Sequence, residues 1–573
     1  MNTCIKALSA TILLFIASVC FAQPYPTDYF RAPMDTPLYL SAPFGSLRDN
    51  HFHSGMDIRT YEKEGLPIYA IADGYVVRIK ISPVGYGKAL YINHPNGYTS
   101  VYGHLQKFEG KLASYIKNYQ YQIKRFDFDH FPEVEKILVK KGEIIGYSGN
   151  SGTSSGPHLH FEIRDTKSEE PINPLLFGIT AVDSLPPFIN RVVFYDLSPN
   201  RPLLLSSETI STKNTLITDS GWVLSDTVKL NTTHVGIGIE TYDYLVHKNK
   251  EYSVYCADLF ADGKKQFSYR MDRINFADTK YINAHIDYEV YKNFGYRINK
   301  CFLDDGNNIN IYPYMRNKGN LSMEVGQYKI VQFCAGDIYG QTFTLYVVMY
   351  CNAASNYTET PCNQVTWYPN KNNQLNTSSI QLTVPKGALY DTLYPCLNFD
   401  LASVKKGLSP VFQIHQPSTP IHVPITISIK PDSVLYTNKL LLGLVNEQGT
   451  IKPAGGDFLN GWVTYKTSTF GSYVVIADSV APQVKIVHLN KRNELTDTTK
   501  INIKVDDLMS GIDTYQGYLN GKWILLEYDP KNDSLTYFFD EQTLFNQKQE
   551  LQLIVTDKKG NSTTLKQVIT LLK

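Results

Sequence analysis

The sequence predicts a mainly β protein: an N-terminal domain of antiparallel β-sheet, followed by three β-sandwich accessory domains of immunoglobulin-like type. Three observations support this prediction. Aromatic residues reach 13%, with 41 Tyr and 27 Phe, and these residue types favour strands. Short apolar runs alternate with turns rich in Gly, Pro and Asn along most of the chain. At roughly 100–200 residues per domain, 573 residues correspond to three to five domains.

The overall charge is nearly balanced. The chain has 55 Lys and Arg against 54 Asp and Glu, which gives a formal net charge of +1. This balance excludes the strongly basic surface of a general nucleic-acid-binding protein. A hydrophobic fraction of 43% with 19% charged residues also excludes a largely disordered chain. We therefore expect folded domains with sizeable cores and no nucleic-acid partner.

Residues 1–22 have the pattern of a secretory signal peptide. Lys6 supplies the positive start, residues 7–21 form the apolar run, and Ala22 is the expected cleavage point. The run is shorter than the ~20 residues that a membrane-spanning helix needs. Cys20 raises a lipoprotein alternative, although Val19 stands where a small residue normally precedes the lipid-bearing cysteine. We expect an exported protein of the periplasm, cell envelope or exterior, with no transmembrane segment after signal cleavage.

The first domain, residues 23–178, differs from the rest of the chain. It is rich in histidine and holds His51, His53, His94, His104, His130, His158 and His160. Its apolar runs predict short strands at 67–72, 75–79, 89–92 and 99–102. Asn96-Gly97, between the last two runs, predicts a tight hairpin because both residues tolerate positive φ. Residues 108–137 interrupt this pattern with helical character, so we expect an insertion there.

The remaining chain is predicted to form three further β domains. We place an immunoglobulin-like sandwich at 179–350, a second sandwich at 351–477 and an immunoglobulin-like sandwich at 478–573. An internal echo supports the first and last of these, although similar turn chemistry alone could generate it. The corresponding segments are 183–187 and 478–482, 236–240 and 510–513, and 337–340 and 557–561.

The cysteines of the mature chain all lie in its middle. They are Cys256, Cys301, Cys334, Cys351, Cys362 and Cys396. An even number in an exported protein permits disulfides, but the sequence does not choose a pairing. Buried free thiols are the alternative.

The segment around His158 and His160 carries the strongest chemical signal. Residues 158–163 alternate polar and apolar side chains, so as a strand they direct both histidines to one face. Leu159, Phe161 and Ile163 then point to the opposite face and into a core. The Gly- and Ser-rich run 149–156 before them can bend sharply and approach a ligand closely. Two imidazoles on one rigid strand suit a metal site or an acid–base pair.

A catalytic zinc site needs three protein ligands and one open position. His53, Asp57 and His160 would supply a nitrogen, oxygen and nitrogen set. His104 and His158 would then be free to handle protons. Each pattern alone is commonly a surface or core feature, but together, within about 110 residues, they indicate a site for one Zn²⁺ per chain. The sequence contains no HExxH helix, so a glutamate base of that type is not available.

The other histidines of this domain have simpler interpretations. We expect His51 and His130 to be structural or exposed to solvent. His94, beside the predicted hairpin, is interpreted as a structural hydrogen-bonding residue.

The same segment resembles the lysostaphin/LytM-like zinc metallo-endopeptidases, which cut peptide bonds in bacterial peptidoglycan. The resemblance covers about a quarter of the chain, and the matching stretches occur in the family's order. They are 44–48 (FGSLR), 52–58 (FHSGMDI), 69–74 (YAIADG), 96–98 (NGY), 102–105 (YGHL), 141–146 (KGEIIG) and 156–163 (GPHLHFEI).

This resemblance implies a role for each candidate residue. His53, Asp57 and His160 would bind zinc, and His104 and His158 would be the catalytic pair. We assign His158 as the base and His104 to the oxyanion or the leaving amine, although these two roles could be exchanged. The family fold is an antiparallel β-sheet domain with a groove across the metal. Because the stretch 108–137 is longer than the family pattern, we expect it to add a groove wall or a partner contact.

The sequence alone leaves three functions open. The first is an exported zinc metallo-endopeptidase that acts on peptidoglycan peptides, with a possible cell-envelope protein partner bound by the C-terminal sandwiches. The second is a non-catalytic relative that activates other wall hydrolases. The third is a surface adhesion or binding protein in which the sandwiches dominate. The presence of all five site residues favours the enzyme, because a relative that has lost activity rarely keeps them all.

Overall fold

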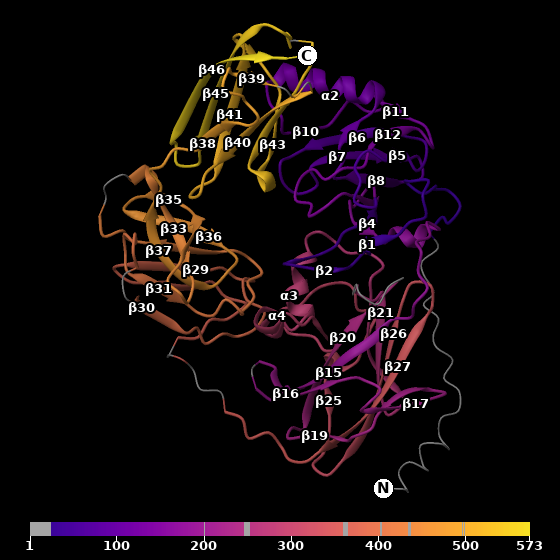
Figure 1. Ribbon diagram of the computed structural model, residues 1–573. Helices are drawn as coiled ribbons and strands as arrows, with labels where there is room; N and C mark the ends of the chain where they lie inside the picture. Colours follow the sequence, from indigo (N-terminus) through magenta and orange to yellow (C-terminus); the bar gives the residue numbers. More distant parts are fainter. Residues whose placement is uncertain are drawn as a thin grey trace.

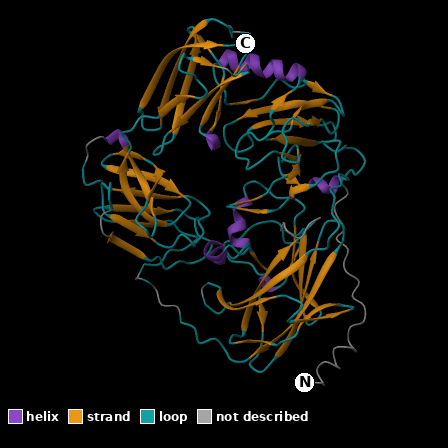
Figure 2. Cartoon of the chain, in the orientation of Figure 1, coloured by secondary structure: helices purple, strands orange, loops and turns teal. Residues whose placement is uncertain are grey.

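The computed structural model describes most of the chain, and its architecture is mainly β (Figure 2). The described residues are 25–199, 201–245, 252–358, 362, 365–401, 404–433, 437–495, 497, 499–541 and 543–572. The predicted signal peptide, residues 1–22, lies outside them. Strands arranged in several sheet units confirm the predicted fold class, whereas the immunoglobulin-like topology and the domain boundaries stay predictions.

The helices of the structure bear on whether the chain crosses a membrane. In the part of the chain that the structure describes, no helix combines the length and the apolar character that crossing a bilayer requires.

The N-terminal domain is built on one large antiparallel sheet. Its strand order is β1 (Leu40–Ala42), β4 (Met56–Arg59), β13 (His158–Asp165), β8 (Tyr98–Gly103), β7 (Lys88–Asn93), β6 (Gly74–Ile81) and β10 (Phe128–His130). In addition, β11 (Leu138–Val139) pairs with β6, and β14 (Pro171–Ile172) pairs with β13. The smaller elements are β2 (Leu47–Arg48) with β3 (His51–Phe52), the sheet β5 (Pro67–Tyr69), β12 (Ile144–Tyr147) and β9 (Lys107–Phe108), and the 3-10 turn η1 (Pro174–Phe177).

The predicted local features of this domain are confirmed. β7 and β8 pair as an antiparallel hairpin, and Gly97 in its turn has φ of 85°. Leu159, Phe161 and Ile163 of β13 are all 0% exposed and lie in the domain core. The strand therefore fixes its histidines from behind through close packing. The insertion forms α2 (Gly110–Ile123) and β10, which extends the sheet at β6.

The second unit packs two sheets over a large shared core. One sheet has the order β16 (Leu203–Thr209), β15 (Phe188–Asp196), β20 (His234–Tyr242) and β23 (Ile298–Lys300), with β25 (Leu321–Ser322) on β20. The other has β17 (Thr215–Thr218), β18 (Gly221–Leu224), β27 (Thr342–Cys351), β26 (Tyr328–Gly336), β21 (Cys256–Ala261), β22 (Lys264–Arg270) and β24 (Tyr314–Met315), with β19 (Val228–Leu230) on β27. Its short helices are η2 (Thr279–Tyr281), α3 (Ile282–His285), α4 (Tyr288–Phe294) and η3 (Asn317–Gly319).

The first two units share apolar packing. Phe44, Leu47 and Phe52 of the N-terminal domain belong to the same buried cluster as the sandwich core. These residues flank His53, so burial against the second unit helps to hold the segment that carries a candidate ligand.

The third and fourth units are also two-sheet arrangements. The third has β28 (Asn373–Asn376), β29 (Ile380–Val384), β32 (Ile425–Ile429), β36 (Trp462–Thr467) and β35 (Asp457–Leu459) opposite β30 (Leu397–Leu401), β31 (Val411–Ile414), β37 (Gly471–Ala477), β33 (Leu440–Val445) and β34 (Ile451–Gly455), with η4 (Thr437–Lys439). The fourth has β38 (Gln483–Ile486), β40 (Lys500–Asp506), β44 (Ser534–Phe538) and β43 (Leu526–Asp529) opposite β39 (Glu494–Leu495), β46 (Ser562–Leu571), β45 (Lys548–Asp557), β41 (Ile512–Leu519) and β42 (Lys522–Trp523), with η5 (Pro530–Asn532). A disulfide joins Cys362 to Cys396 in the third unit.

The four units follow one another around a closed loop, so that the C-terminal unit (yellow) lies beside the N-terminal domain (indigo) in Figure 1. The predicted insertion makes much of this contact, because Lys117 of α2 pairs with Glu541 at 2.8 Å and the Tyr121 ring meets Trp523 at 5.3 Å. Further contacts, nearer the candidate site, join Lys88 to Glu527 and Lys531 to the carbonyl groups of Asn150 and Gly152. The partner that the insertion contacts is thus a part of its own chain.

Candidate metal centre

The sheet places two of the predicted ligands side by side. In the register of β13 with β4, His160 stands opposite Asp57, and directly opposed residues on one face of a sheet are in contact. His53 follows β3 and reaches the same point from a turn that passes close to β13. A Cβ atom at Gly55 would lie only 2.4 Å from the carbonyl oxygen of Phe161, so this approach requires glycine.

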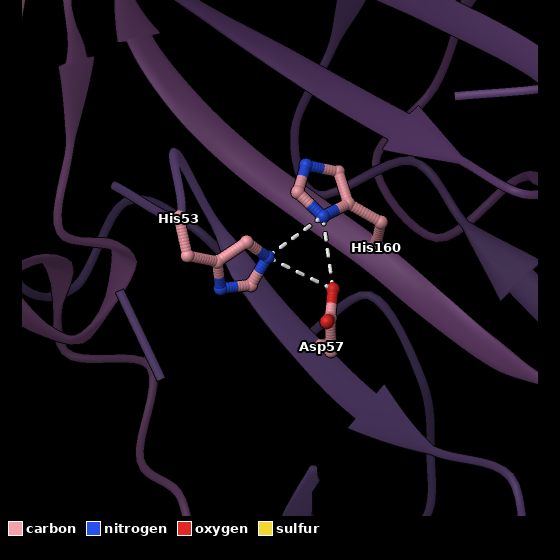
Figure 3. A group of neighbouring side chains, drawn as sticks. All are labelled: His53, Asp57 and His160. Atoms are coloured by element: carbon pink, nitrogen blue, oxygen red, sulfur yellow. Dashed lines mark hydrogen bonds and ion pairs between the residues drawn. The ribbon is translucent and has the colours of Figure 1, made fainter. Parts of the chain in front are cut away.

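The three side chains converge on one another (Figure 3). Nε2 of His53 lies 3.1 Å from Nδ1 of His160 and 3.0 Å from Oδ1 of Asp57, and the last two atoms are 2.9 Å apart. Tetrahedral zinc with ligands at about 2.0–2.1 Å requires ligand atoms roughly 3.3 Å apart. The donor set and the spacing therefore fit a zinc ion bound on one side of this triangle after a small relaxation.

Each ligand is oriented by a hydrogen bond on its far side. Nδ1–H of His53 donates to the carbonyl oxygen of Pro43 at 3.0 Å, which leaves the Nε2 lone pair free. Nε2–H of His160 donates to Glu162 at 2.8 Å, so that Nδ1 faces Asp57 and His53. Arg48 donates to Oδ2 of Asp57 at 2.7 Å, so that Oδ1 faces the histidines. Such partners fix the tautomer and the direction of metal ligands.

The charges within the cluster favour the metal-binding forms of Asp57 and His53, whereas His160 must give up a proton before it can bind a metal. Burial would raise the pKa of Asp57, but the adjacent imidazoles, His53 foremost, hold this pKa well below its ordinary value. Burial lowers the pKa of His53 more than Asp57 raises it. Burial would also lower the pKa of His160, but its bonds to Asp57 and Glu162 raise it to about 9. A metal at Nδ1 of His160 would take the place of the proton that faces Asp57.

Glu162 is the hub of the surrounding hydrogen bonds. It is 0% exposed, and its Oε1 accepts from His160, from the Ser54 hydroxyl at 2.7 Å and from the Tyr86 hydroxyl at 2.5 Å. Its Oε2 accepts from Arg164 at 2.6 Å. Burial opposes ionisation of Glu162, but Arg164 and His160 hold the pKa of this carboxyl far below its ordinary value. Glu162 is therefore a permanent anion behind His160.

Three neighbours of the ligands, Arg48, Tyr86 and Glu162, were not predicted. Glu162 could have been found from the strand alternation, because it lies two residues beyond His160 on the same face. Tyr86 stacks on the His160 ring at 4.7 Å but comes from the loop between β6 and β7. Arg48 and Tyr86 carry no sequence signal that specifies these contacts.

His104 and His158 lie next to each other at the edge of the ligand cluster, with ring centroids 4.7 Å apart. Nδ1–H of His104 donates to the Ser151 carbonyl oxygen at 2.8 Å, and Nδ1–H of His158 donates to the Gly156 carbonyl oxygen at 2.9 Å. Both rings therefore present Nε2 as the unprotonated nitrogen. Nε2 of His158 lies 3.4 Å from Oδ1 of Asp57. Burial, reinforced by His160 and His158, lowers the pKa of His104 to about 3.

The remaining histidines of the domain lie away from this cluster. His94 is held between the Asp73 carbonyl at 2.9 Å and the Ser100 hydroxyl at 2.8 Å, as expected for a structural hydrogen-bonding residue. His51 is exposed, and His130 packs among the tyrosines of α2.

Residues 51–121 and 133–174 match the model of Peptidase family M23, and both matched segments carry candidate site residues. The N-terminal domain belongs to Peptidase family M23. This membership confirms the resemblance to the lysostaphin/LytM-like peptidases. The gap in the match falls within the predicted insertion, and a separate match assigns residues 364–478 to a Zu5-like domain.

Similar curated proteins share this one region. The DD-carboxypeptidase/endopeptidase Mpg of Neisseria meningitidis is 33% identical over 141 residues, which cover 24% of this chain and 26% of Mpg. The peptidoglycan DD-endopeptidase ShyA of Vibrio cholerae is 29% identical over 27% of this chain and 31% of its own. The glycyl-glycine endopeptidase ALE-1 of Staphylococcus capitis is 31% identical over 21% and 26%, respectively. The chain thus spans about a quarter to a third of the length of these relatives.

Among solved structures, the catalytic domain of lysostaphin from Staphylococcus simulans is 25% identical. The match covers 24% of this chain and 91% of that domain, with a TM-score of 0.19.

Proposed function

We propose that the protein is an exported zinc metallo-endopeptidase that hydrolyses peptide bonds of bacterial peptidoglycan. The observation that carries this proposal is the convergence of His53 Nε2, Asp57 Oδ1 and His160 Nδ1 to within 3.1 Å of one another in a Peptidase family M23 domain. Two imidazoles and a carboxylate are the donors that catalytic zinc takes. When bound, zinc would polarise the scissile carbonyl and lower the pKa of water toward ~7.

The residues of the chain would divide the remaining work. His53, Asp57 and His160 would hold the metal, while Glu162 and Arg48 keep two of these ligands in position. His158 would accept the proton of the attacking water at Nε2, because a proton there lies beside the Asp57 carboxylate.

His104 would serve the oxyanion or the leaving amine. Its Nδ1 proton is committed to Ser151, so only Nε2 can take part in the reaction. Since the pKa of His104 is lowered to about 3, it would donate from Nε2 only after it has received a proton in the course of the reaction. The adjacent His158 is the nearest imidazole that could supply this proton.

The names of the relatives support peptidoglycan as the substrate. Mpg is named a DD-carboxypeptidase/endopeptidase, ShyA a peptidoglycan DD-endopeptidase and ALE-1 a glycyl-glycine endopeptidase. Peptidoglycan lies outside the cytoplasm, which agrees with the signal-like pattern at residues 1–22. We place the enzyme in the periplasm or elsewhere in the cell envelope.

Digestion of purified peptidoglycan tests this function. Zinc-loaded wild-type protein should release new amino groups and shorter peptides detectable by mass spectrometry, whereas His160→Ala should release none. The exposed His51 provides the matched control, because His51→Ala removes an imidazole two residues from a ligand without touching the cluster. If the wild type binds one zinc yet cleaves no peptide bond, the protein is a regulator rather than a hydrolase.

A further inference from the structure

Three aspartates stand near one another where the second unit contacts the N-terminal domain. Asp183 precedes β15, Asp243 follows β20 and Asp337 follows β26. The three carboxylates act electrostatically on one another. Asp183 and Asp243 also line one small cavity, together with residues of the N-terminal domain that include Leu40 and Asn173.

Asp243 is the member of this trio that has an unsatisfied oxygen. It is only 5% exposed, and its Oδ1 has no hydrogen-bond partner. The charged groups that act on it most strongly are Asp183 and Asp337, and with burial they raise the pKa of Asp243 to about 8. A buried carboxylate with one unsatisfied oxygen, beside two others, is costly unless a proton or a cation neutralises it.

The fourth unit holds a corresponding trio, whose carboxylates converge more closely than those of the first trio. Asp478 precedes β38, Asp507 follows β40 and Asp557 ends β45. One carboxylate oxygen from each lies within 4.8 Å of the others. Asp478 and Asp557 are 0% and 1% exposed, and Oδ2 of Asp507 is buried without a hydrogen-bond partner. The hydroxyl of Ser510, on the same turn as Asp507, is also buried and has no partner.

The two trios correspond position by position. The first aspartate of each trio stands five residues before the opening strand of its unit. The second follows the next central strand and leaves one oxygen unsatisfied. The third accepts two backbone N–H groups, from the residues two and four positions further on, at 2.8 Å each. The partial echo at 183–187 and 478–482 is therefore the start of a complete three-residue repeat.

We propose that each trio binds one calcium ion, in sites separate from the histidine cluster. All the ligands are oxygens, which suit a hard divalent cation rather than zinc. Ca²⁺ accepts six to eight oxygens in flexible geometry, so backbone carbonyls and water can complete two sites that differ in detail, whereas Mg²⁺ demands a near-ideal octahedron. Sites of this kind in extracellular modules bind with Kd on the order of 10⁻⁴–10⁻³ M.

Metal analysis of the full-length, zinc-loaded protein tests the proposal. After equilibrium dialysis against about 5 mM Ca²⁺, the wild type should hold two Ca²⁺ per chain. Asp243→Asn and Asp507→Asn should each hold one, and the double variant none, with zinc content constant throughout. The exposed Asp219 and Asp513 lie in the same two units, so Asp219→Asn and Asp513→Asn are matched controls that should keep both ions.

A second measurement, made on the wild-type protein, tests calcium binding even if a variant fails to fold. Tb³⁺ commonly replaces Ca²⁺ and emits when a nearby tyrosine absorbs light, and Tyr339 interacts with all three residues of the first trio. Wild-type protein should give Tb³⁺ emission that Ca²⁺ quenches at millimolar concentration. Wild-type protein that binds no Ca²⁺ and shows no Ca²⁺-sensitive Tb³⁺ emission would overturn the proposal. Folded Asn variants that retain both ions would overturn it equally.

Discussion

His160 on β13 and His285 on α3 are 3% and 1% exposed, respectively, yet their surroundings differ. His160 lies between two carboxylates, Asp57 and Glu162, and its pKa is raised to about 9. His285 lies among aromatic rings in the second unit, where burial, reinforced by Lys300, lowers its pKa to about 3. Burial alone is therefore a poor guide to a functional histidine, and the charge of the adjacent groups distinguishes the two.

Removing each of these two imidazoles in turn should give the largest difference in zinc binding and activity. His160→Ala should abolish stoichiometric zinc binding and lower the rate of peptidoglycan cleavage by at least about 10³-fold, because zinc contributes several kcal/mol to the transition state. His285→Ala should lower the thermal midpoint but keep the zinc. Metal analysis and amine release check both. A His160→Ala protein with normal zinc content would refute the ligand assignment.

His158 is intermediate between His160 and His285. It lies beside the carboxylate of Asp57 but is not assigned as a metal ligand. His158→Ala should keep its zinc and lose about 10²–10⁴-fold in kcat, as expected for a general base. His51→Ala, which removes an exposed imidazole, should leave kcat unchanged. Loss of zinc from His158→Ala would instead show that His158 coordinates the metal.

Replacing Glu162, the carboxylate that accepts the Nε2–H of His160, should have a smaller effect on zinc binding. Glu162→Gln keeps the shape of the side chain but removes the charge that orients His160, so zinc affinity should fall by about 10–100-fold. Competition with a chromogenic chelator measures this affinity. Glu135→Gln, on the exposed surface of the insertion, should leave it unchanged.

The low pKa of His285 predicts a pH-dependent stability. Since His285 titrates near 6.5 when unfolded and near 3 when folded, it contributes fully above pH 6.5, and this contribution is lost as the pH falls toward 3. Between pH 6 and 4, the free energy of unfolding of the second unit should fall by about 1.4 kcal/mol per pH unit from this group. His285→Gln should remove that part of the slope in urea titrations. Identical slopes for the two proteins would contradict the lowered pKa.

The smallest effect is expected at the contact between the two ends of the chain. Lys531 binds the carbonyl groups of Asn150 and Gly152, on either side of the Ser151 carbonyl that holds His104. Lys531→Ala should loosen this loop and lower kcat by about 2–5-fold, the equivalent of one modest hydrogen bond, at constant zinc content. The exposed Lys548 of the same unit supplies the control, and a rate increase in Lys531→Ala would show that the contact restrains the enzyme.

Local sequence patterns predicted the parts of the site that depend on short-range geometry. The alternation of β13 places His158 and His160 on one face and Leu159 in the core, and the hairpin at Gly97 follows from its turn residues. The sequence also revealed the first and last members of the aspartate repeat. It did not reveal the middle member, Asp243, because that residue stands seven residues beyond the start of the segment that showed the echo.

The rest depends on contacts between distant parts of the chain. Tyr86 and Arg48 reach the ligands through loop conformations that no local pattern specifies. The disulfide between Cys362 and Cys396 depends on Cα atoms that the fold of the third unit brings to 5.0 Å from each other. The contact partner of the insertion is likewise determined by the packing of the fourth unit.

The contact of Lys531 with the loop at 150–152 links the order of synthesis to the completion of the site. The two partners are 381 residues apart, so at about 5–20 residues per second the loop waits roughly 20–80 s for the lysine to emerge. A chain cut short before its last unit would fold the histidine cluster but leave the adjacent loop without this support. Full support of the loop at 150–152 therefore requires the fourth unit.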